Sequence, residues 1–185
     1  HSLRVARYSK VLGAELNFDQ EQLFRLELAA IFHDIGKIGT PDEVLLKPGR
    51  LNADEFEIMK KHPVESAEIL KNFHFFHDLL PGVLHHHERV DGRGYPHGLK
   101  NEDIPLFARI IIIADTFDAM TSTRAYRNAL SADTAIKEIE DCSGTQFDPN
   151  LAKEFIRAIK NDLKRIDGKD KDLIIPTGNV LKYVA

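Results

Sequence analysis

The sequence predicts an all-α domain. Apolar residues recur at the spacing of an α-helix through most of the chain, and two capping boxes, Asp19 with Gln22 and Asn52 with Glu55, mark the starts of helices. The longest apolar run, residues 110–114, has no partner strands elsewhere in the sequence. With 185 residues, 43% of them hydrophobic, the chain is long enough to bury a core without disulfides.

Composition narrows the classes of function. The formal net charge of −4 argues against a general nucleic-acid-binding surface, because neutralising phosphates needs a basic face. The single cysteine, Cys142, excludes an internal disulfide and fits a reducing cytoplasm. No apolar run is long enough to cross a bilayer and the start does not resemble a signal peptide, so we expect a cytoplasmic domain, with anchoring elsewhere in a full-length protein left open. Because the chain begins inside a helical pattern, we expect an upstream regulatory segment before it.

The first predicted helix covers residues 3–16. Its apolar stripe has His1 four residues before Val5, which predicts that His1 faces inward. A frayed terminus or a vector remnant is the alternative for His1. The second predicted helix opens at the Asp19 capping box, continues to His33 and ends by Gly36.

The end of this second helix carries the adjacent residues His33 and Asp34, followed one turn later by Lys37. Helical geometry puts His33 and Lys37 on one face with Asp34 beside them, so an imidazole, a carboxylate and a cation can converge on one point. We interpret this stretch as the centre of a metal site. A single buried histidine with a capping aspartate is the alternative.

A further histidine is predicted at a junction between two helices. The helix that opens at the Asn52 capping box leads to His62, and Pro63 fits the first turn of the helix that follows. A junction can aim a side chain at a point that mid-helix geometry does not reach. A helix-end histidine that only forms a hydrogen bond is the alternative for His62.

Three consecutive histidines, His85, His86 and His87, follow the next apolar segment. On a helix adjacent side chains diverge by about 100°, so two of them could bind neighbouring ions while the third faces elsewhere. The glycine-rich turn at 91–96 matches no nucleotide-cradling motif. The histidines outside these patterns are predicted to lie at the surface: His74, His77 and His97.

The most apolar segment, residues 104–120, keeps helical spacing and is predicted as a buried helix. Asp115 lies within it, and burying this carboxylate unpaired would be costly, so it needs a metal ion, an arginine or a hydrogen-bond donor. Asp118 is interpreted as holding helix ends or the basic residues that follow. Of these, Arg124 and Arg127 could grip a phosphate or remain solvated surface.

Two scaffold helices complete the predicted domain, one capped by Ser131 and one that starts at Asp148 and Pro149. The domain is predicted to cover residues 1–162. Residues 163–185 are first highly charged and then apolar, which predicts a linker and a short C-terminal tail.

Eight short motifs occur in order along the chain. They are HSLRVA at 1–6, HDIGKIGTPD at 33–42, KPG at 47–49, MKKHP at 59–63, HHERVDGRGYP at 86–96, IPLFARI at 104–110, ADTFDAMTS at 114–122 and GTQFDP at 144–149. Together they make the chain, up to about residue 159, resemble the HD-GYP family, a branch of the HD-domain metal-dependent phosphohydrolases. The resemblance implies an HD-domain helical bundle with a buried di- or trinuclear metal site.

The resemblance also implies the site residues. The implied metal ligands are His1, His33, Asp34, His62, His86, His87 and Asp115. They would hold two or three divalent ions, iron or manganese; members with three ions use a glutamate about one turn before the first histidine, a position that precedes this chain. The implied substrate contacts are Lys37, Tyr95, Arg124 and Arg127.

The activity that the resemblance implies is hydrolysis of cyclic di-GMP to linear pGpG and onward to GMP. A hydroxide bridging two ions would attack the phosphodiester phosphorus, because metal coordination lowers the pKa of water from about 15.7 to near 7. In this hypothesis His33, Asp34 and Lys37 are catalytic. Lys37 and the arginines offset charge on the phosphoryl oxygens, and Tyr95 bonds to or stacks on the nucleotide.

Three alternatives stay open. The first is an HD-superfamily phosphohydrolase acting on another nucleotide or (p)ppGpp. The second is a non-catalytic module that binds cyclic di-GMP or a protein through the GYP loop, the loop that contains Gly94, Tyr95 and Pro96, and the third is a di-iron oxygenase. The expected partners are cyclic di-GMP as substrate, the protein's own upstream sensory or receiver domain, GGDEF-type proteins at the GYP loop, and a second copy in a homodimer. General nucleic-acid binding is not expected.

Overall fold

The computed structural model describes residues 1–123 and 128–167. The α-helices there are α1 (Ser2–Glu15), α2 (Gln20–Phe32), α3 (Asp42–Leu45), α4 (Ala53–Met59), α5 (His62–Leu70), α6 (Leu80–Leu84), α7 (Leu106–Thr121), α8 (Ala132–Asp141) and α9 (Pro149–Asp167). The 3-10 helices are η1 (Ile35–Gly39), η2 (His74–Leu79) and η3 (Asn101–Asp103). No strand forms within these described ranges, so the predicted all-α class is confirmed.

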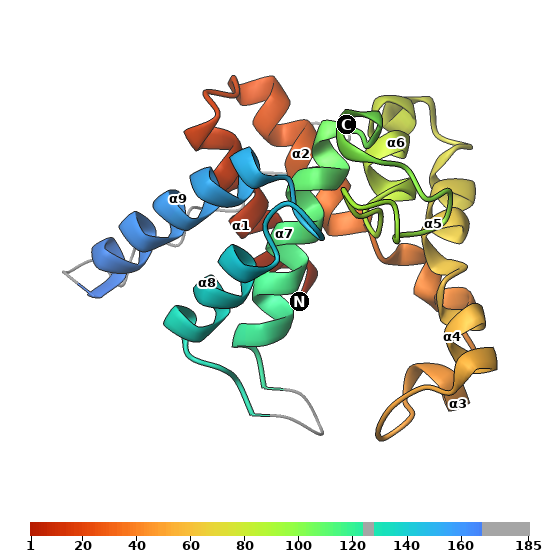
Figure 1. Cartoon of the computed structure of the whole chain (residues 1–185). Helices are drawn as coiled ribbons and strands as arrows, with labels where there is room; N and C mark the ends of the chain where they lie inside the picture. The colour runs from red at the N-terminus through yellow and green to blue at the C-terminus, as the bar shows by residue number, and fades with distance from the viewer. Residues whose placement is uncertain (124–127, 168–185) are drawn as a thin grey trace.

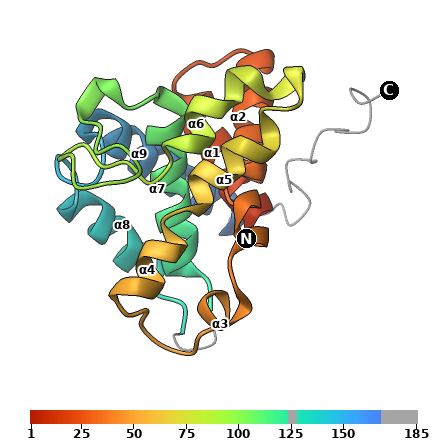
Figure 2. The same ribbon diagram turned by 90° about the vertical axis from the view of Figure 1, so that its right-hand side faces the viewer.

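Helix α7 is the central element of the bundle (Figures 1 and 2). It packs against α1 and α6 and against the pair α8 and α9, which lie together on one side in Figure 1. Its four consecutive isoleucines, residues 110–113, are all buried. A helix that is covered on several sides can be apolar all round, which explains why this segment has no polar stripe.

The local helix signals of the sequence are confirmed. Asp19 accepts a hydrogen bond from the backbone N–H of Gln22 at 2.8 Å, and the Gln22 side chain accepts one from the Asp19 N–H at 3.0 Å. The same reciprocal box forms at Asn52, and Ser131 accepts from the Thr134 N–H to cap α8. Each of these bonds satisfies a backbone donor that a helix start leaves unpaired.

Two details of the helices differ from the sequence prediction. The three consecutive histidines form a turn after α6, with His85 as its C-cap, because the chain here leaves the helix to enter the loop that contains Tyr95. Helix α9 continues to Asp167, past residue 162, where the predicted domain ends, and Leu163 still packs against the core. The division between domain and tail stays a prediction.

Among residues 1–123 and 128–167, no helix combines the length and the apolar composition that crossing a bilayer requires.

Candidate metal centre

Three buried histidines are oriented in the same way by the backbone. His33 donates from Nδ1 to the carbonyl of Ala30, His62 to that of Met59, and His86 to that of Val83, at 2.7, 2.7 and 2.6 Å. A carbonyl can only accept, so Nδ1 carries the hydrogen and Nε2 of each neutral ring is a bare lone pair. This arrangement fixes the tautomer and the direction of a metal-binding nitrogen.

The Asp34 carboxylate lies between these nitrogens. Its Oδ1 is 3.1 Å from Nε2 of His62 and 3.7 Å from Nε2 of His86. Its Oδ2 is 3.3 Å from Nε2 of His33 and 3.7 Å from Nε2 of His1. One carboxylate thus faces imidazoles contributed by several separate helices.

The seven implied ligands fall into two groups, within each of which the ligand atoms lie within 4.8 Å of one another. The groups are Asp34 with His62, His86 and His87, and His1 with His33 and Asp115. The distance of 3.3 Å between His1 Nε2 and Asp115 Oδ1 brings together the start of α1 and the middle of α7. The geometry therefore provides room for two neighbouring cations, with Asp34 between them.

The chemistry of this cluster fits metal ions. Bare lone pairs face carboxylate oxygens, and neither His33 Nε2 nor Asp34 Oδ1, both buried, has a hydrogen-bond partner among the described residues. Acceptors facing acceptors repel one another unless a cation lies between them, and buried polar atoms left without a partner are costly. Imidazole and carboxylate are ligands that first-row divalent metals accept.

The ionisation states agree with that requirement. Burial lowers the pKa of His86 to about 4 and that of His87 well below its ordinary value. Burial alone would raise the pKa of Asp34, but the four histidines around it, His1, His33, His62 and His86, hold that pKa well below the usual range. Neutral imidazoles beside an ionised carboxylate are the forms that coordinate metals.

His1 and His33 sit in the more acidic part of the cluster. Asp115, Asp118 and Asp34 together raise the pKa of His1 to about 11. For His33, burial disfavours the charged ring, but Asp34 and Asp115 outweigh it and raise the pKa. This excess of negative charge attracts a cation to the same place.

The sequence reasoning did not assign the residues that hold His1. Asp118, 1% exposed at its side chain, accepts from His1 Nδ1 at 2.7 Å and from Arg4 Nε at 2.6 Å. Asp118 therefore orients the first histidine toward the centre, whereas the sequence suggested the later basic residues as its partners. Its position one turn after Asp115 on α7 was the available signal.

A contact between η1 and α5 ties the two histidine-bearing segments together. The Gly36 N–H donates to Ser66 Oγ at 2.8 Å, and the Ser66 hydroxyl donates to the His33 carbonyl at 2.9 Å. A side chain at position 36 would meet the carbonyl of His62 at 2.3 Å, so only glycine allows this approach. The backbones that carry His33 and His62 are thereby held in contact.

The predicted substrate residues are arranged around the same centre. Lys37 Nζ lies 2.5 Å from Asp34 Oδ2. The Tyr95 ring stacks on His87, with ring centres 4.8 Å apart and planes 25° apart. Burial, followed by the charges of Asp34 and Asp115, raises the pKa of the Tyr95 hydroxyl. Arg124 and Arg127 lie outside the described residues.

The loop that carries Tyr95 is fixed by a buried carboxylate that sequence reasoning passed over. Glu88, 1% exposed, accepts hydrogen bonds from the N–H groups of His97, Gly98 and Leu99 at 2.7, 3.1 and 3.0 Å. Its place directly after the histidine triplet was the only hint in the sequence. We refer to residues 88–100 as the GYP loop.

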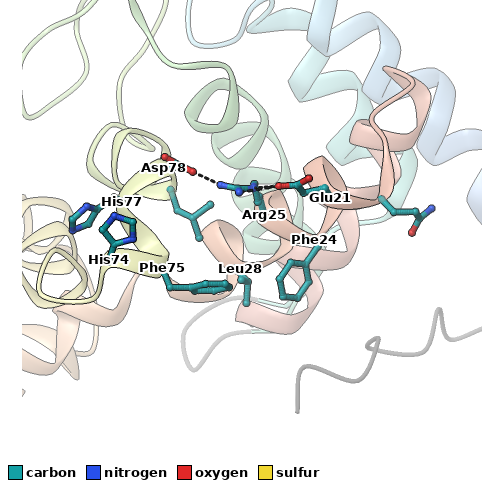
Figure 3. Close-up of a pocket in the computed structure, with 10 residues that line it drawn as sticks. Glu21, Phe24, Arg25, Leu28, His74, Phe75, His77 and Asp78 are labelled. Carbon is teal, nitrogen blue, oxygen red and sulfur yellow. Dashed lines mark hydrogen bonds and ion pairs between the residues drawn. The ribbon is translucent and has the colours of Figure 1, made fainter. Parts of the chain in front are cut away.

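Two cavities of the structure differ in how they lie relative to this centre. A cavity of about 310 Å³ borders the centre at His87 and Tyr95 and is also lined by Phe56, Lys60 and Arg93. A cavity of about 730 Å³ lies between α2 and η2, where Arg25 pairs with Glu21 and Asp78 (Figure 3). None of the predicted ligands or substrate residues among residues 1–123 and 128–167 lines this larger cavity, so its size is not a reason to assign it the chemistry.

The fold and the centre define a class: a helical protein in which histidines and aspartates from separate helices converge in two groups that could hold metal ions. The chain belongs to the HD domain family, whose model matches residues 1–151. The predicted family is thus confirmed.

Relatives with assigned names agree with this family. The chain is 39% identical over 174 residues to a cyclic di-GMP phosphodiesterase of Thermotoga maritima, covering 93% of this chain and 47% of the relative. It is 40% identical over 168 residues to the cyclic di-GMP phosphodiesterase response regulator RpfG of Xanthomonas campestris, covering 90% and 44%. The chain therefore spans less than half the length of these curated relatives.

A solved structure shares the fold. The crystal structure of a cyclic GMP-AMP-specific phosphodiesterase of Vibrio cholerae, V-cGAP3, superposes with a TM-score of 0.72 at 22% sequence identity. The match covers 93% of this chain and 46% of that structure. At this identity the likeness bears on the fold alone.

Proposed function

We propose that this chain is a metal-dependent phosphodiesterase domain that hydrolyses cyclic di-GMP to linear pGpG and onward to GMP. The observation that carries the proposal is the convergence of seven histidines and aspartates in two neighbouring groups, with Asp34 of one group facing His33 of the other. The names of relatives that are 39–40% identical to the chain support the substrate. Divalent ions held at the two groups would lower the pKa of water enough for it to attack phosphorus at neutral pH.

Some residues of the chain would bind the metal ions, and others orient the side chains of these ligands. His62, His86 and His87 would hold one ion and His1, His33 and Asp115 the other, with Asp34 reaching both. The backbone carbonyls behind His33, His62 and His86 keep their coordinating nitrogens aimed inward. Asp118 and Arg4 do the same for His1.

The substrate would lie over the centre and extend into the cavity of about 310 Å³ at Tyr95. Tyr95 and Phe56, whose rings meet edge to face at 6.2 Å, offer an apolar wall to a base. Lys37 beside Asp34, and Lys60 and Arg93 at the cavity, supply positive charge for phosphate. Arg124 and Arg127 are proposed to bind phosphate as well.

The test is a substrate panel with protein purified anaerobically with its metals. Cyclic di-GMP, 3′3′-cyclic GMP-AMP and (p)ppGpp are incubated separately and the products are separated by chromatography. The proposal predicts the fastest turnover for cyclic di-GMP, with pGpG formed first. Faster hydrolysis of (p)ppGpp would instead favour a different HD-superfamily phosphohydrolase.

A non-catalytic module that binds cyclic di-GMP is the second candidate, because it would use the same GYP loop. Tight binding without turnover in protein with a full metal complement would support it. The complete ligand set argues for the enzyme, since binding a nucleotide alone does not require two groups of metal ligands. A di-iron oxygenase leaves Lys37 and the cationic cavity without a use.

We also propose iron or manganese as the ions, the cytoplasm as the place of action, and an upstream sensory or receiver domain as the regulator. The greater length of the curated relatives supports an additional domain. GGDEF-type proteins at the GYP loop and a homodimer complete the proposed partners. Metal analysis of anaerobically purified protein and light scattering would test the ions and the oligomeric state.

A further inference from the structure

The pair His85 and His97 lies outside the seven-ligand centre and has no part in the proposed hydrolysis. His85 ends α6 and His97 belongs to the GYP loop, so the two belong to different segments. Nε2 of His85 and Nδ1 of His97 are 3.1 Å apart. The ring centres are 5.2 Å apart and the planes are inclined by 49°. The two rings therefore face each other through these nitrogen atoms and are not stacked.

This geometry matches a pair of histidines within the metal centre itself. Nε2 of His62 and Nε2 of His86 are 3.3 Å apart, with ring centres 5.3 Å apart and planes inclined by 50°. Two nitrogens bound to one zinc ion at about 2.0–2.1 Å, with an angle of about 90–109°, lie about 2.8–3.4 Å apart. The separation between His85 and His97 is therefore compatible with one shared ion.

His85 is also oriented like the histidines of the centre. Its Nδ1 donates to the carbonyl of Pro81 at 2.9 Å, as the Nδ1 atoms of His33, His62 and His86 donate to carbonyls three residues before them. The hydrogen on Nδ1 leaves Nε2 of the neutral ring as a bare lone pair directed at His97. One of the two ligands is thus already in the coordinating tautomer.

His97 is held by the same loop contacts that hold Tyr95 in place. Its backbone N–H donates to the buried carboxylate of Glu88, which fixes the start of its side chain opposite His85. Without an ion, the Nδ1–H of His97 donates to Nε2 of His85. When an ion binds, that proton moves from Nδ1 to Nε2 of the same ring, which leaves Nδ1 of His97 as a lone pair for the ion.

We propose that His85 and His97 form a second, peripheral binding site for a transition-metal ion with a preference for imidazole, such as Zn²⁺. Imidazole pairs suit zinc, copper and nickel, and water completes the coordination at an accessible site. A bound ion joins the end of α6 to the GYP loop two residues after Tyr95. It therefore restrains the loop that borders the cavity of about 310 Å³.

The test uses the protein with its central metals in place. Zn²⁺ is titrated by equilibrium dialysis, and all metals are counted in each sample by mass spectrometry, so that exchange within the centre is detected as loss of the original ions. The parent protein should take up one additional zinc ion per chain. The substitution His97→Gln should weaken that binding by at least about tenfold, since loss even of an outer partner of a ligand costs 10–100-fold in affinity.

His77→Gln is the matched control. His74 and His77 also form a close ring pair, with centres 4.9 Å apart, but His77 Nε2 donates to the carbonyl of Lys71 and is not free to coordinate. This variant should bind the additional zinc as the parent does. Hydrogen exchange provides a second readout: zinc should slow exchange in the GYP loop of the parent and not of His97→Gln.

Three results would overturn the proposal: no additional zinc in the parent, equal affinity in His97→Gln, or zinc uptake that occurs only by displacement of the central ions. The proposal does not depend on the proposed function. Cyclic di-GMP hydrolysis can fail while the peripheral site binds zinc, and the reverse also holds.

Discussion

Ser66→Ala tests how the two halves of the metal centre are joined. Ser66 accepts from the Gly36 N–H and donates to the carbonyl of His33, and its side chain is fully buried. Alanine removes both bonds and leaves a buried donor and a buried acceptor, each costing about 1–3 kcal/mol. Because a carbonyl tolerates the loss better than an N–H group, we expect a total of about 2–4 kcal/mol.

The assay is chemical and thermal unfolding of metal-loaded protein, together with its metal content. At this chain length each kcal/mol corresponds to about 2–4 °C, so the melting temperature should fall by roughly 4–16 °C. Metal affinity should fall as well, because the backbones of His33 and His62 lose their link. Ser131→Ala is the control: it removes a surface helix cap for about 1 kcal/mol and should leave metal affinity unchanged.

A change in the unfolding free energy of Ser66→Ala below about 0.5 kcal/mol, the range of ordinary surface substitutions, would refute this reasoning. So would a loss of stability with unchanged metal affinity, because the serine would then support the fold without positioning the centre.

The remaining predictions concern the surroundings of the centre. Asp118→Asn should weaken metal binding by about 10–100-fold in competition with a chelator, because His1 loses its ionised orienting partner; unchanged affinity would contradict this role. Gly94→Ala should prevent stable folding of the GYP loop, since a Cβ there would lie 2.4 Å from the backbone nitrogen of Arg89. A variant with the thermal stability of the parent would disprove this close contact between the two backbone segments. Hydrogen bonds from Arg89 lower the pKa of Asp91 to about 2. The pair therefore stabilises the fold above pH 3.8, and this stabilisation is lost as the pH falls toward 2. Asp91→Asn should reduce the loss of stability between these pH values, as measured by urea unfolding.

Those parts of the fold that depend on interactions between residues close in the sequence could be predicted. The capping boxes at Asp19 and Asn52 are formed by residues three apart, and both formed as expected. The turn at His85 was not predicted, because periodicity alone does not reveal that the chain leaves α6 to enter the GYP loop. The end of α9 was not predicted, because the charged composition after Asp162 contains no local signal for where the helix stops.

The sequence was sufficient to predict which residues form the candidate site, but not which of them are in contact. Helical geometry already indicated that His33, Asp34 and Lys37 converge, whereas the contact between His1 and Asp118 joins positions 117 residues apart. The pairing of Glu88 with three backbone N–H groups likewise depends on how the loop closes. Such long-range contacts are set by packing, which no local pattern encodes.

The measurement that tests the central claim most directly is the number of metal ions per chain together with cyclic di-GMP turnover, determined on the same anaerobic sample for the parent and Asp34→Asn. Because the Asp34 carboxylate faces the imidazoles of both groups, the parent should hold at least two ions per chain and form pGpG, while the variant loses metal and turnover together. An Asp34→Asn protein that keeps the full metal complement and hydrolyses cyclic di-GMP at the parent rate would contradict the account.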